Sequence, residues 1–242
     1  MELRVERINK HYKKKHALKD FSCVFNEGVN ILLGPNGAGK STLMNGIADI
    51  INLDSGNIYF NNESTLKLGK HFRKQLGYLP QNPEFYPFFT GKQIIDYFAV
   101  LKGLGKDEYN PEELLAKVNL SESINIRCGG YSGGMKRRLG IAVTLLGSPS
   151  VMILDEPTAG LDPKERIAFK NTLKELSDNH IIIMATHIIS DAEDVGCKMV
   201  LINNGEKLTE GSMESLVDSV KSEINRQEVS LDDVYLHWFN DR

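Results

Sequence analysis

Residues 34–42 read Gly34-Pro35-Asn36-Gly37-Ala38-Gly39-Lys40-Ser41-Thr42, a glycine-rich run that ends in a lysine and two hydroxyl residues. It follows the apolar segment 29–33 and precedes an apolar stretch with Leu43, Ile47 and Ile50, so we expect a strand, a loop and a helix. Glycines let successive backbone N–H groups point at phosphate oxygens, and a helix N-terminus favours negative charge. The run therefore predicts a phosphate-binding loop (P-loop), in which Lys40 reaches the β- and γ-phosphates of a nucleotide and Ser41 binds Mg²⁺. A glycine-rich turn without a ligand is the alternative, and the ordered set ending in Lys-Ser disfavours it.

Three further segments, 151–154, 181–185 and 199–202, are as short as 29–33 and, like it, nearly all apolar. Parallel strands of α/β proteins are buried on both faces and have such runs. Residues 2–9 instead alternate apolar with charged side chains, and the apolar residues of 21–25 repeat this spacing, as half-buried antiparallel strands do. The sequence therefore predicts an α/β core and one small antiparallel sheet.

A helical region interrupts the predicted core at about residues 85–147. Helical patterning covers 94–101, 114–118 and 139–146, with prolines between them. We expect one domain over 1–215 with this helical subdomain inserted into it. Two helices, 213–224 and 231–239, are expected beyond Gly211, so residues 216–242 form a short C-terminal tail, too short for a separate regulatory domain.

Composition excludes several classes. The 242 residues are 41% hydrophobic and 25% charged, which is ordinary for a globular chain. No apolar run approaches the roughly 18–20 residues of a membrane span, and the first residues do not form a secretory signal, so we expect a cytoplasmic chain. The net charge of −3 provides no basic field for nucleic acid. Three cysteines without paired spacing argue against disulfides or a zinc ribbon, and we interpret them as small buried residues.

Two adjacent carboxylates follow the apolar segment 151–154, in Val-Met-Ile-Leu-Asp155-Glu156-Pro. Open α/β sheets bind ligands at the carboxyl edge of their strands. Asp155 suits Mg²⁺ coordination, and Glu156 suits a general base that activates the water attacking the γ-phosphate. A solvated acidic turn is the alternative reading, and the P-loop upstream disfavours it.

A third motif, Tyr131-Ser132-Gly133-Gly134-Met135, precedes the apolar-periodic stretch that ends near Leu146. Ser132 is the predicted N-cap of that helix, and the two glycines leave backbone N–H groups open to a phosphate. Such a run alone is more typical of a flexible cap. Its position shortly before Asp155 favours a nucleotide contact.

Taken together, these motifs resemble the nucleotide-binding subunit of ATP-binding cassette (ABC) transporters over nearly the whole chain. The matching elements, in chain order, are Tyr12 as the adenine-stacking aromatic, residues 34–42 as Walker A, Gln81 as the Q-loop, residues 131–135 as the signature, residues 151–156 as Walker B, Asp162 as the D-loop and His187 as the switch histidine. The resemblance implies a P-loop NTPase (RecA-like) core with a mostly parallel sheet, a small antiparallel β subdomain and an inserted helical subdomain.

The resemblance also implies a mechanism. Two subunits pack head to tail, and each ATP lies between the P-loop of one chain and the signature of the other, so residues 132–134 complete the partner's site. Gln81 bridges Mg²⁺ or the attacking water to the helical subdomain. His187 contacts the γ-phosphate, and Asp162 contacts the partner's P-loop.

Some residues depart from the common pattern. Tyr131 replaces the usual leucine of the signature and Met135 the usual glutamine, while residues 132–134 are intact, so hydrolysis is still expected. With residues 229–236, these variants resemble ATPase subunits of bacterial ABC-2-type exporters. The expected function is a Mg²⁺-dependent ATPase that powers export through a separate transmembrane permease, paired with a second copy or a paralogue, on the inner face of the membrane and without nucleic acid.

Three rival functions are less favoured. A soluble ABC ATPase of the iron–sulfur assembly or cell-division type would drive a complex that transports nothing. A translation-factor-type protein would have two cassettes and a basic linker. A P-loop kinase or GTPase does not explain residues 132–134 with His187, and the chain has no Asn-Lys-x-Asp stretch to recognise guanine.

Two features remain open from the sequence. The lysine-rich run 11–16 suggests acidic lipid or nucleic acid but is more typical of a solvated turn, and Tyr12 within it is either the adenine contact or a surface tyrosine. Phe85, Tyr86, Phe88 and Phe89 either form a groove that grips a permease helix or pack inside the helical subdomain. Exposure of these rings would favour the groove.

Overall fold

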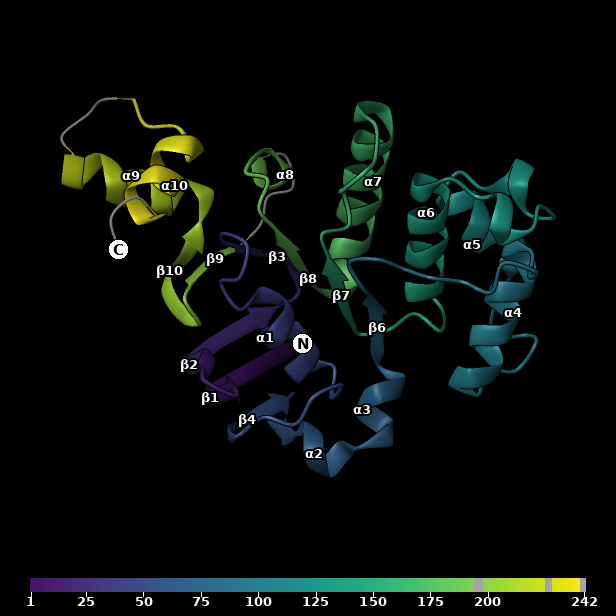
Figure 1. The fold of residues 1–242 in the computed structure, drawn as a ribbon, viewed down its shortest axis with the longest axis horizontal. Helices are drawn as coiled ribbons and strands as arrows, with labels where there is room; N and C mark the ends of the chain where they lie inside the picture. Colours follow the sequence, from purple (N-terminus) through teal and green to yellow (C-terminus); the bar gives the residue numbers. More distant parts are fainter. Residues whose placement is uncertain (194–197, 225–227, 240–242) are drawn as a thin grey trace.

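The computed structural model describes residues 1–193, 198–224 and 228–239. Its main sheet consists of β3 (Gly28–Leu33), β6 (Leu76–Leu79), β7 (Val151–Asp155), β8 (Ile181–Thr186), β9 (Lys198–Asn203) and β10 (Glu206–Ser212). The strand order is β10-β9-β3-β8-β7-β6, with parallel pairing from β9 through β6 and antiparallel pairing of β10 with β9 (Figure 1). This mostly parallel sheet confirms the predicted α/β class.

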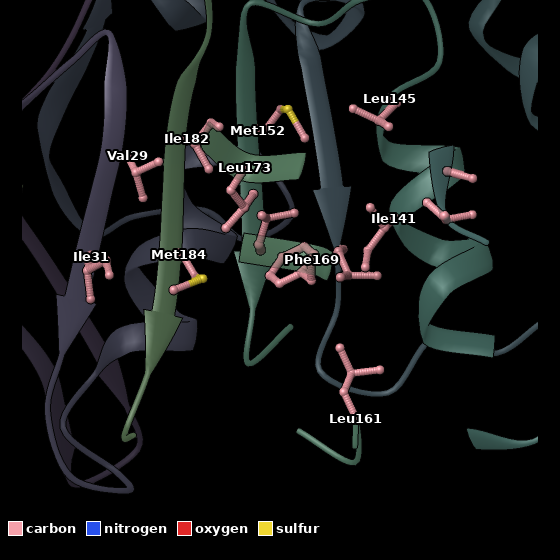
Figure 2. Close-up of a cluster of buried hydrophobic side chains, with 14 of the residues drawn as sticks. Val29, Ile31, Ile141, Leu145, Met152, Leu161, Phe169, Leu173, Ile182 and Met184 are labelled. Carbon is pink, nitrogen blue, oxygen red and sulfur yellow. The ribbon is translucent and has the colours of Figure 1, made fainter. Parts of the chain in front are cut away.

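The apolar runs are continuous because their strands are buried on both faces. Met152, Ile182 and Met184 belong to a core cluster on one face, where Figure 2 shows them with Phe169 and Leu173 of α7 (Pro163–Leu176). The neighbouring side chains in β7 and β8 belong to a second cluster on the opposite face. Full burial of one such side chain stabilises the fold by about 1.5–3 kcal/mol.

The predicted small antiparallel sheet is also present. It consists of β1 (Glu2–Tyr12), β2 (Lys15–Asn26), β4 (Ser55–Phe60) and β5 (Glu63–Ser64), in the order β2-β1-β4-β5. Its apolar face and α1 (Lys40–Ile47) share the second cluster with the main sheet. The expectation that Ile50 belongs to the apolar helix is wrong. Asp49 adopts a left-handed φ of +58° after α1 ends, and Ile50 beyond it is 57% exposed.

The three predicted helical stretches between β6 and β7 are α4 (Gly91–Lys102), α5 (Pro111–Lys117) and α6 (Gly133–Thr144). They lie together beyond the β6 edge of the main sheet (Figure 1). Each begins at a side-chain cap: Thr90 forms a capping box with Gln93, Asn110 caps α5, and Ser132 caps α6 as predicted. Such caps accept hydrogen bonds from N–H groups that lack a partner within the helix. The division into domains stays a prediction.

The remaining helices are α2 (Thr65–Leu68), α3 (Lys70–Lys74), α8 (Ser190–Glu193), α9 (Met213–Ile224) and α10 (Leu231–Phe239). The bounds of α9 and α10 confirm the two predicted C-terminal helices. Leu216, Val220, Leu231 and Val234 join the core cluster that α7 covers, so this tail packs on the main body. No helix within the described ranges has the length and apolarity to cross a membrane. Cys23 and Cys128 are buried, as expected, and Cys197 lies outside the described residues.

Candidate functional site

The predicted P-loop connects β3 to the N-terminus of α1. Gly37 and Gly39 have φ angles of +82° and +111°, in the left-handed region that other residues rarely adopt. A Cβ on Gly39 would also lie 2.7 Å from the carbonyl oxygen of Ala17, so this position requires glycine. Because Gly39 offers no side-chain cap, the N–H groups of the first turn of α1 are available to an anion.

Lys40 bends back over this loop. Its side chain is 6% exposed, and Nζ donates to the carbonyl oxygens of Gly34 at 2.6 Å and Pro35 at 3.1 Å. Burial lowers the pKa of Lys40, while the charges of Glu156 and Asp155 act in the opposite direction. A phosphate oxygen would be a stronger acceptor for this ammonium than a neutral carbonyl, because charge-assisted hydrogen bonds are about twice as strong.

A cavity of about 350 Å³ lies over the P-loop. It is lined by Lys15, Ala17, residues 36–42, Gln81, Asp155 and Glu156. The structure thus brings together the predicted phosphate, metal and general-base residues, which come from three separate stretches of the chain. They meet at the carboxyl ends of β3, β6 and β7, where parallel sheets place their ligands.

Asp155 is the last residue of β7 and is buried at the floor of this cavity. Burial raises the pKa of Asp155, and the hydrogen bond from the Ser41 hydroxyl has the opposite effect, as do the charges of Lys40 and Arg137. Ser41 and Asp155, both predicted to bind Mg²⁺, therefore contact each other.

Glu156 follows in a left-handed conformation, with φ of +50°. Its carboxylate is 6% exposed, and Oε1 lies 2.7 Å from Nδ1 of His187. The two residues follow the adjacent strands β7 and β8, which explains why positions so far apart in the sequence meet. The structure thus places the predicted switch histidine against the predicted base.

The other predicted nucleotide contacts are not among the cavity-lining residues. Ser132 and Gly133 are exposed at the start of α6, and Ser132 Oγ accepts a hydrogen bond from Met135 N at 3.2 Å. Tyr12 is 45% exposed at the tip of the β1–β2 hairpin, where it pairs with Lys15. Asp162 is the N-cap of α7 and is exposed.

Contacts within the chain link the predicted D-loop to the predicted signature helix. Asp162 Oδ1 accepts from the backbone N–H of Glu165 at 2.8 Å. Glu165 in turn pairs with Arg138 of α6 at 3.2 Å, and its carboxylate lies near Gly134. These contacts couple the position of the N-terminus of α7 to that of α6.

Arg137 is a buried residue that the sequence analysis missed. Its guanidinium donates from Nη1 to the carbonyl oxygen of Glu156 and from Nη2 to that of Gln81. One signal was available: helical spacing puts Arg137 on the same face as Gly140 and Ile141, which are buried. Residues 136–138 are all Lys or Arg, and this spacing identifies Arg137 as the one that points inward.

Two further residues were missed. Asp191 is buried, and its Oδ2 accepts from the hydroxyls of Thr158 at 2.6 Å and Thr186 at 3.0 Å, which joins the segments after β7 and β8. Lys15 lines the cavity with its Nζ 3.4 Å from the carbonyl oxygen of Gly37. The run of lysines at 13–15 did not indicate which of them faces the P-loop.

Of the four aromatic residues after Gln81, two fit the expected packing inside the helical subdomain and two fit the expected exposed groove. Phe85 and Phe89 are half-buried against the core, whereas Tyr86 and Phe88 are exposed, Phe88 by 77%. Tyr86 contacts both Phe89 and Tyr97 through its ring. Two rings therefore pack inward, and two remain available to a partner.

Comparison with known proteins gives concordant matches. The family model described as ABC transporter matches residues 18–159. The chain is 38% identical to the uncharacterized ABC transporter ATP-binding protein YxlF of Bacillus subtilis, over 88% of this chain and 72% of that protein. It is 33% identical to the linearmycin resistance ATP-binding protein LnrL of the same organism, over 88% and 70%. A dimeric structure of the ATP-binding cassette MJ0796 with ADP and Pi superposes with a TM-score of 0.79 at 26% identity, over 87% and 98%.

Proposed function

This chain belongs to the ABC transporter family as an ATP-binding and ATP-hydrolysing subunit, and from this premise we propose that it powers export through a separate transmembrane permease. In the proposed cycle two subunits close head to tail around ATP, and hydrolysis reopens them. The observation that carries the proposal is the cavity in which the P-loop, Gln81, Asp155 and Glu156 converge. The likeness to a protein named for linearmycin resistance supports the choice of an exporter.

The cavity fits the phosphates of ATP. The uncapped N-terminus of α1 offers backbone donors, and Lys40 offers an ammonium that now bonds to loop carbonyls. A volume of about 350 Å³ lies within the range of small-molecule sites. Tyr12 is the proposed adenine contact, since the exposed ring lies on the same hairpin as the cavity residue Lys15. Base–aromatic stacking is worth about 1–3 kcal/mol in nucleic-acid complexes.

Mg²⁺ also fits the residues present. Ser41 and the buried carboxylate of Asp155 contact each other, and Gln81 lines the same cavity, so three oxygen donors are available to a hard cation. When bound, Mg²⁺ would neutralise charge on the β- and γ-phosphates. In this proposal Ser41, Gln81 and Asp155 hold the ion.

Glu156 is the proposed general base. Its carboxylate lines the cavity and would accept a proton from the attacking water, a role typically worth 10²–10⁴-fold in rate. With a proton on each ring nitrogen, His187 would donate from Nδ1, at 2.7 Å, to this carboxylate and from the other ring nitrogen to the γ-phosphate.

Residues 132–134 and Asp162 are proposed to act on the site of a second subunit. Their position outside the cavity of their own chain supports this role, and so does the likeness to a dimeric cassette. The second subunit is either another copy or a paralogue.

The permease is proposed to dock on the exposed aromatic rings after Gln81. Tyr86 and Phe88 offer a large apolar surface, and half-buried Phe85 and Phe89 anchor the same segment. Such docking would hold the subunit on the inner face of the membrane. It would also connect the permease to Gln81 and therefore to the nucleotide.

Affinity purification of this chain from its native membrane, with ATPase rates measured for the bound and free fractions, tests the proposal. We expect a polytopic permease to accompany the chain and to change its rate. A hydrolysing chain that binds soluble proteins alone would contradict the transport role and favour a soluble ABC ATPase.

A further inference from the structure

Arg137 is a buried cation that the proposed catalytic steps do not use. It lies in the first turns of α6, is 7% exposed, and donates to the backbone carbonyls of Glu156 and Gln81. The two acceptors belong to the segments that contain the proposed base and the proposed Mg²⁺ ligand of the Q-loop. A single side chain of the helical region therefore holds both segments.

The backbone at Glu156 needs such support. Its φ of +50° is uncommon for a residue other than glycine, asparagine or aspartate. The Glu156 N–H donates to the carbonyl oxygen of Ala185 at 3.0 Å, and its own carbonyl accepts from the N–H of Ala159 at 3.2 Å. The first bond is made to β8 of the main sheet, and the second comes from the turn that follows Glu156. The bond from Arg137 is the one that reaches Glu156 from α6.

The chemistry of arginine suits this position. A guanidinium presents several N–H donors in a rigid plane and so can bond two carbonyl oxygens at once, whereas a lysine ammonium is a compact point charge. Burial lowers the pKa of Arg137, and the nearby carboxylates of Glu156 and Asp155 act in the opposite direction.

We propose that Arg137 is a positioning residue for ATP hydrolysis, which holds Glu156 and Gln81 in register with each other and with the signature helix. The proposal rests on the proposed function, because it takes Glu156 as the base and Gln81 as a Mg²⁺ ligand. Since α6 begins at the signature, a shift of this helix on closing around ATP would move both carbonyls through one side chain.

The test compares Arg137→Met, Arg137→Lys and the control Arg127→Met, which removes an exposed arginine of the same region. Steady-state ATPase assays give kcat and KM, and binding of a fluorescent ATP analogue gives affinity. We expect Arg137→Met to lower kcat about 10–100-fold, as misplacement of catalytic groups does, with KM and affinity changed less than about threefold. Arg137→Lys should recover part of kcat, because it keeps the charge and can reach one carbonyl.

Hydrogen exchange provides a readout that does not depend on turnover. Without Arg137, the non-proline amides of 155–160 and 79–84 should exchange faster in the folded protein, while those of α9 should not change. Wild-type kcat in Arg137→Met, or equal losses of kcat and affinity, would overturn the proposal, as would unchanged exchange. If Arg137→Met does not fold, Arg137→Lys decides by the same kcat-against-KM comparison. A wild-type chain without hydrolysis would count against the proposed function, and the exchange data would still show whether Arg137 holds the two segments.

Discussion

At the residue scale, Glu156 combines a left-handed backbone, a buried carboxylate and a contact to His187. A non-glycine residue in this region costs about 1–3 kcal/mol, and such strain persists where surrounding bonds fix the conformation. Here the bonds to Ala185, Ala159 and Arg137 fix it. The strain directs a carboxylate into the cavity, which relates a local cost in stability to the proposed chemistry.

Glu156→Gln tests this residue alone. The amide keeps the shape and can still bond to His187 but cannot take a proton from water, so we expect kcat to fall about 10²–10⁴-fold with ATP affinity retained. The ATP-bound dimer should then accumulate, as size-exclusion chromatography with light scattering would detect. Glu175→Gln, at an exposed position of α7, is the matched control. Turnover at the wild-type rate would exclude Glu156 as the base.

The sequence could predict the residues of this site whose roles follow from the order of motifs, such as Lys40, Asp155 and Glu156. Helical spacing could place Arg137 on the inner face of α6, but the sequence could not predict the partners of Arg137 or Asp191, because these are backbone carbonyls and threonine hydroxyls that only the folded chain brings near. A carbonyl has no residue type to recognise. Positioning groups of this kind are therefore found from structure.

At the element scale, Asp191 of α8 joins the segments after β7 and β8 through Thr158 and Thr186. Both hydroxyls are buried, so removing the acceptor leaves two donors without a partner. We expect Asp191→Ala to lower the free energy of unfolding by about 2–6 kcal/mol, at about 1–3 kcal/mol for each of the two unsatisfied groups. Asp191→Asn keeps one oxygen acceptor and should lose less than half as much.

Urea denaturation at neutral pH would measure both changes, with exposed Asp178→Ala as the control. Equal stability of Asp191→Ala and the wild type would show that the two hydroxyls find other acceptors.

Lys102, the last residue of α4, gives a pH-dependent prediction. Its Nζ donates to the carbonyl oxygen of Leu146 at 2.8 Å, and burial lowers the pKa of Lys102 from 10.5 to about 8. Between these values the unfolded chain holds a proton that the folded chain lacks, so the free energy of unfolding rises with pH in this window. Below about pH 8 the full cost of burying the charge is present.

Lys102→Met removes this titration. We expect the stability of the variant relative to the wild type to decrease as pH rises from 8 toward 10, in urea titrations at each pH. Lys106→Met, at an exposed position just beyond α4, should show no such trend. A constant difference across this range would mean that Lys102 is solvated in the folded protein.

The strands differ in how well the sequence predicts them. β3, β7, β8 and β9 are largely apolar because both faces are covered, and β1 and β2 alternate because only one face is covered. By contrast, β6 has four residues, and β10 reads Glu-Lys-Leu-Thr-Glu-Gly-Ser and pairs with β9 alone at the sheet edge. Pairing with a neighbour determines such strands more than their own side chains do, and the sequence analysis did not predict them.

At the scale of the whole molecule, the cavity and the signature lie on different parts of one chain. The P-loop opens from the centre of the main sheet, while α6 belongs to the helices beyond the β6 edge (Figure 1). A single chain therefore surrounds the proposed ATP site incompletely. The inserted helices were predictable from periodicity, but their position relative to the P-loop depends on where β6 and β7 lie in the sheet, and the chain order does not reveal this.

Two defective chains should complement each other if the subunits pack head to tail. Lys40→Ala loses the phosphate-binding ammonium and keeps the signature. Gly133→Asp keeps the P-loop, and a Cβ at this position meets nothing within 4 Å, so the monomer should fold while its signature repels phosphate. We expect each variant alone to be nearly inactive in steady-state ATPase assays.

Mixing the two variants in equal amounts should restore activity. Half of the randomly formed dimers are mixed, and each mixed dimer has one site built from an intact P-loop and an intact signature, so about a quarter of the wild-type rate is expected. If the P-loop and the signature of the same chain acted together, every site in the mixture would contain one defect, and the rate would stay at that of the separate variants. A mixture of Lys40→Ala with Glu156→Gln gives the negative control. It leaves no intact site for hydrolysis in any arrangement, because each P-loop lies in a chain with its own catalytic defect.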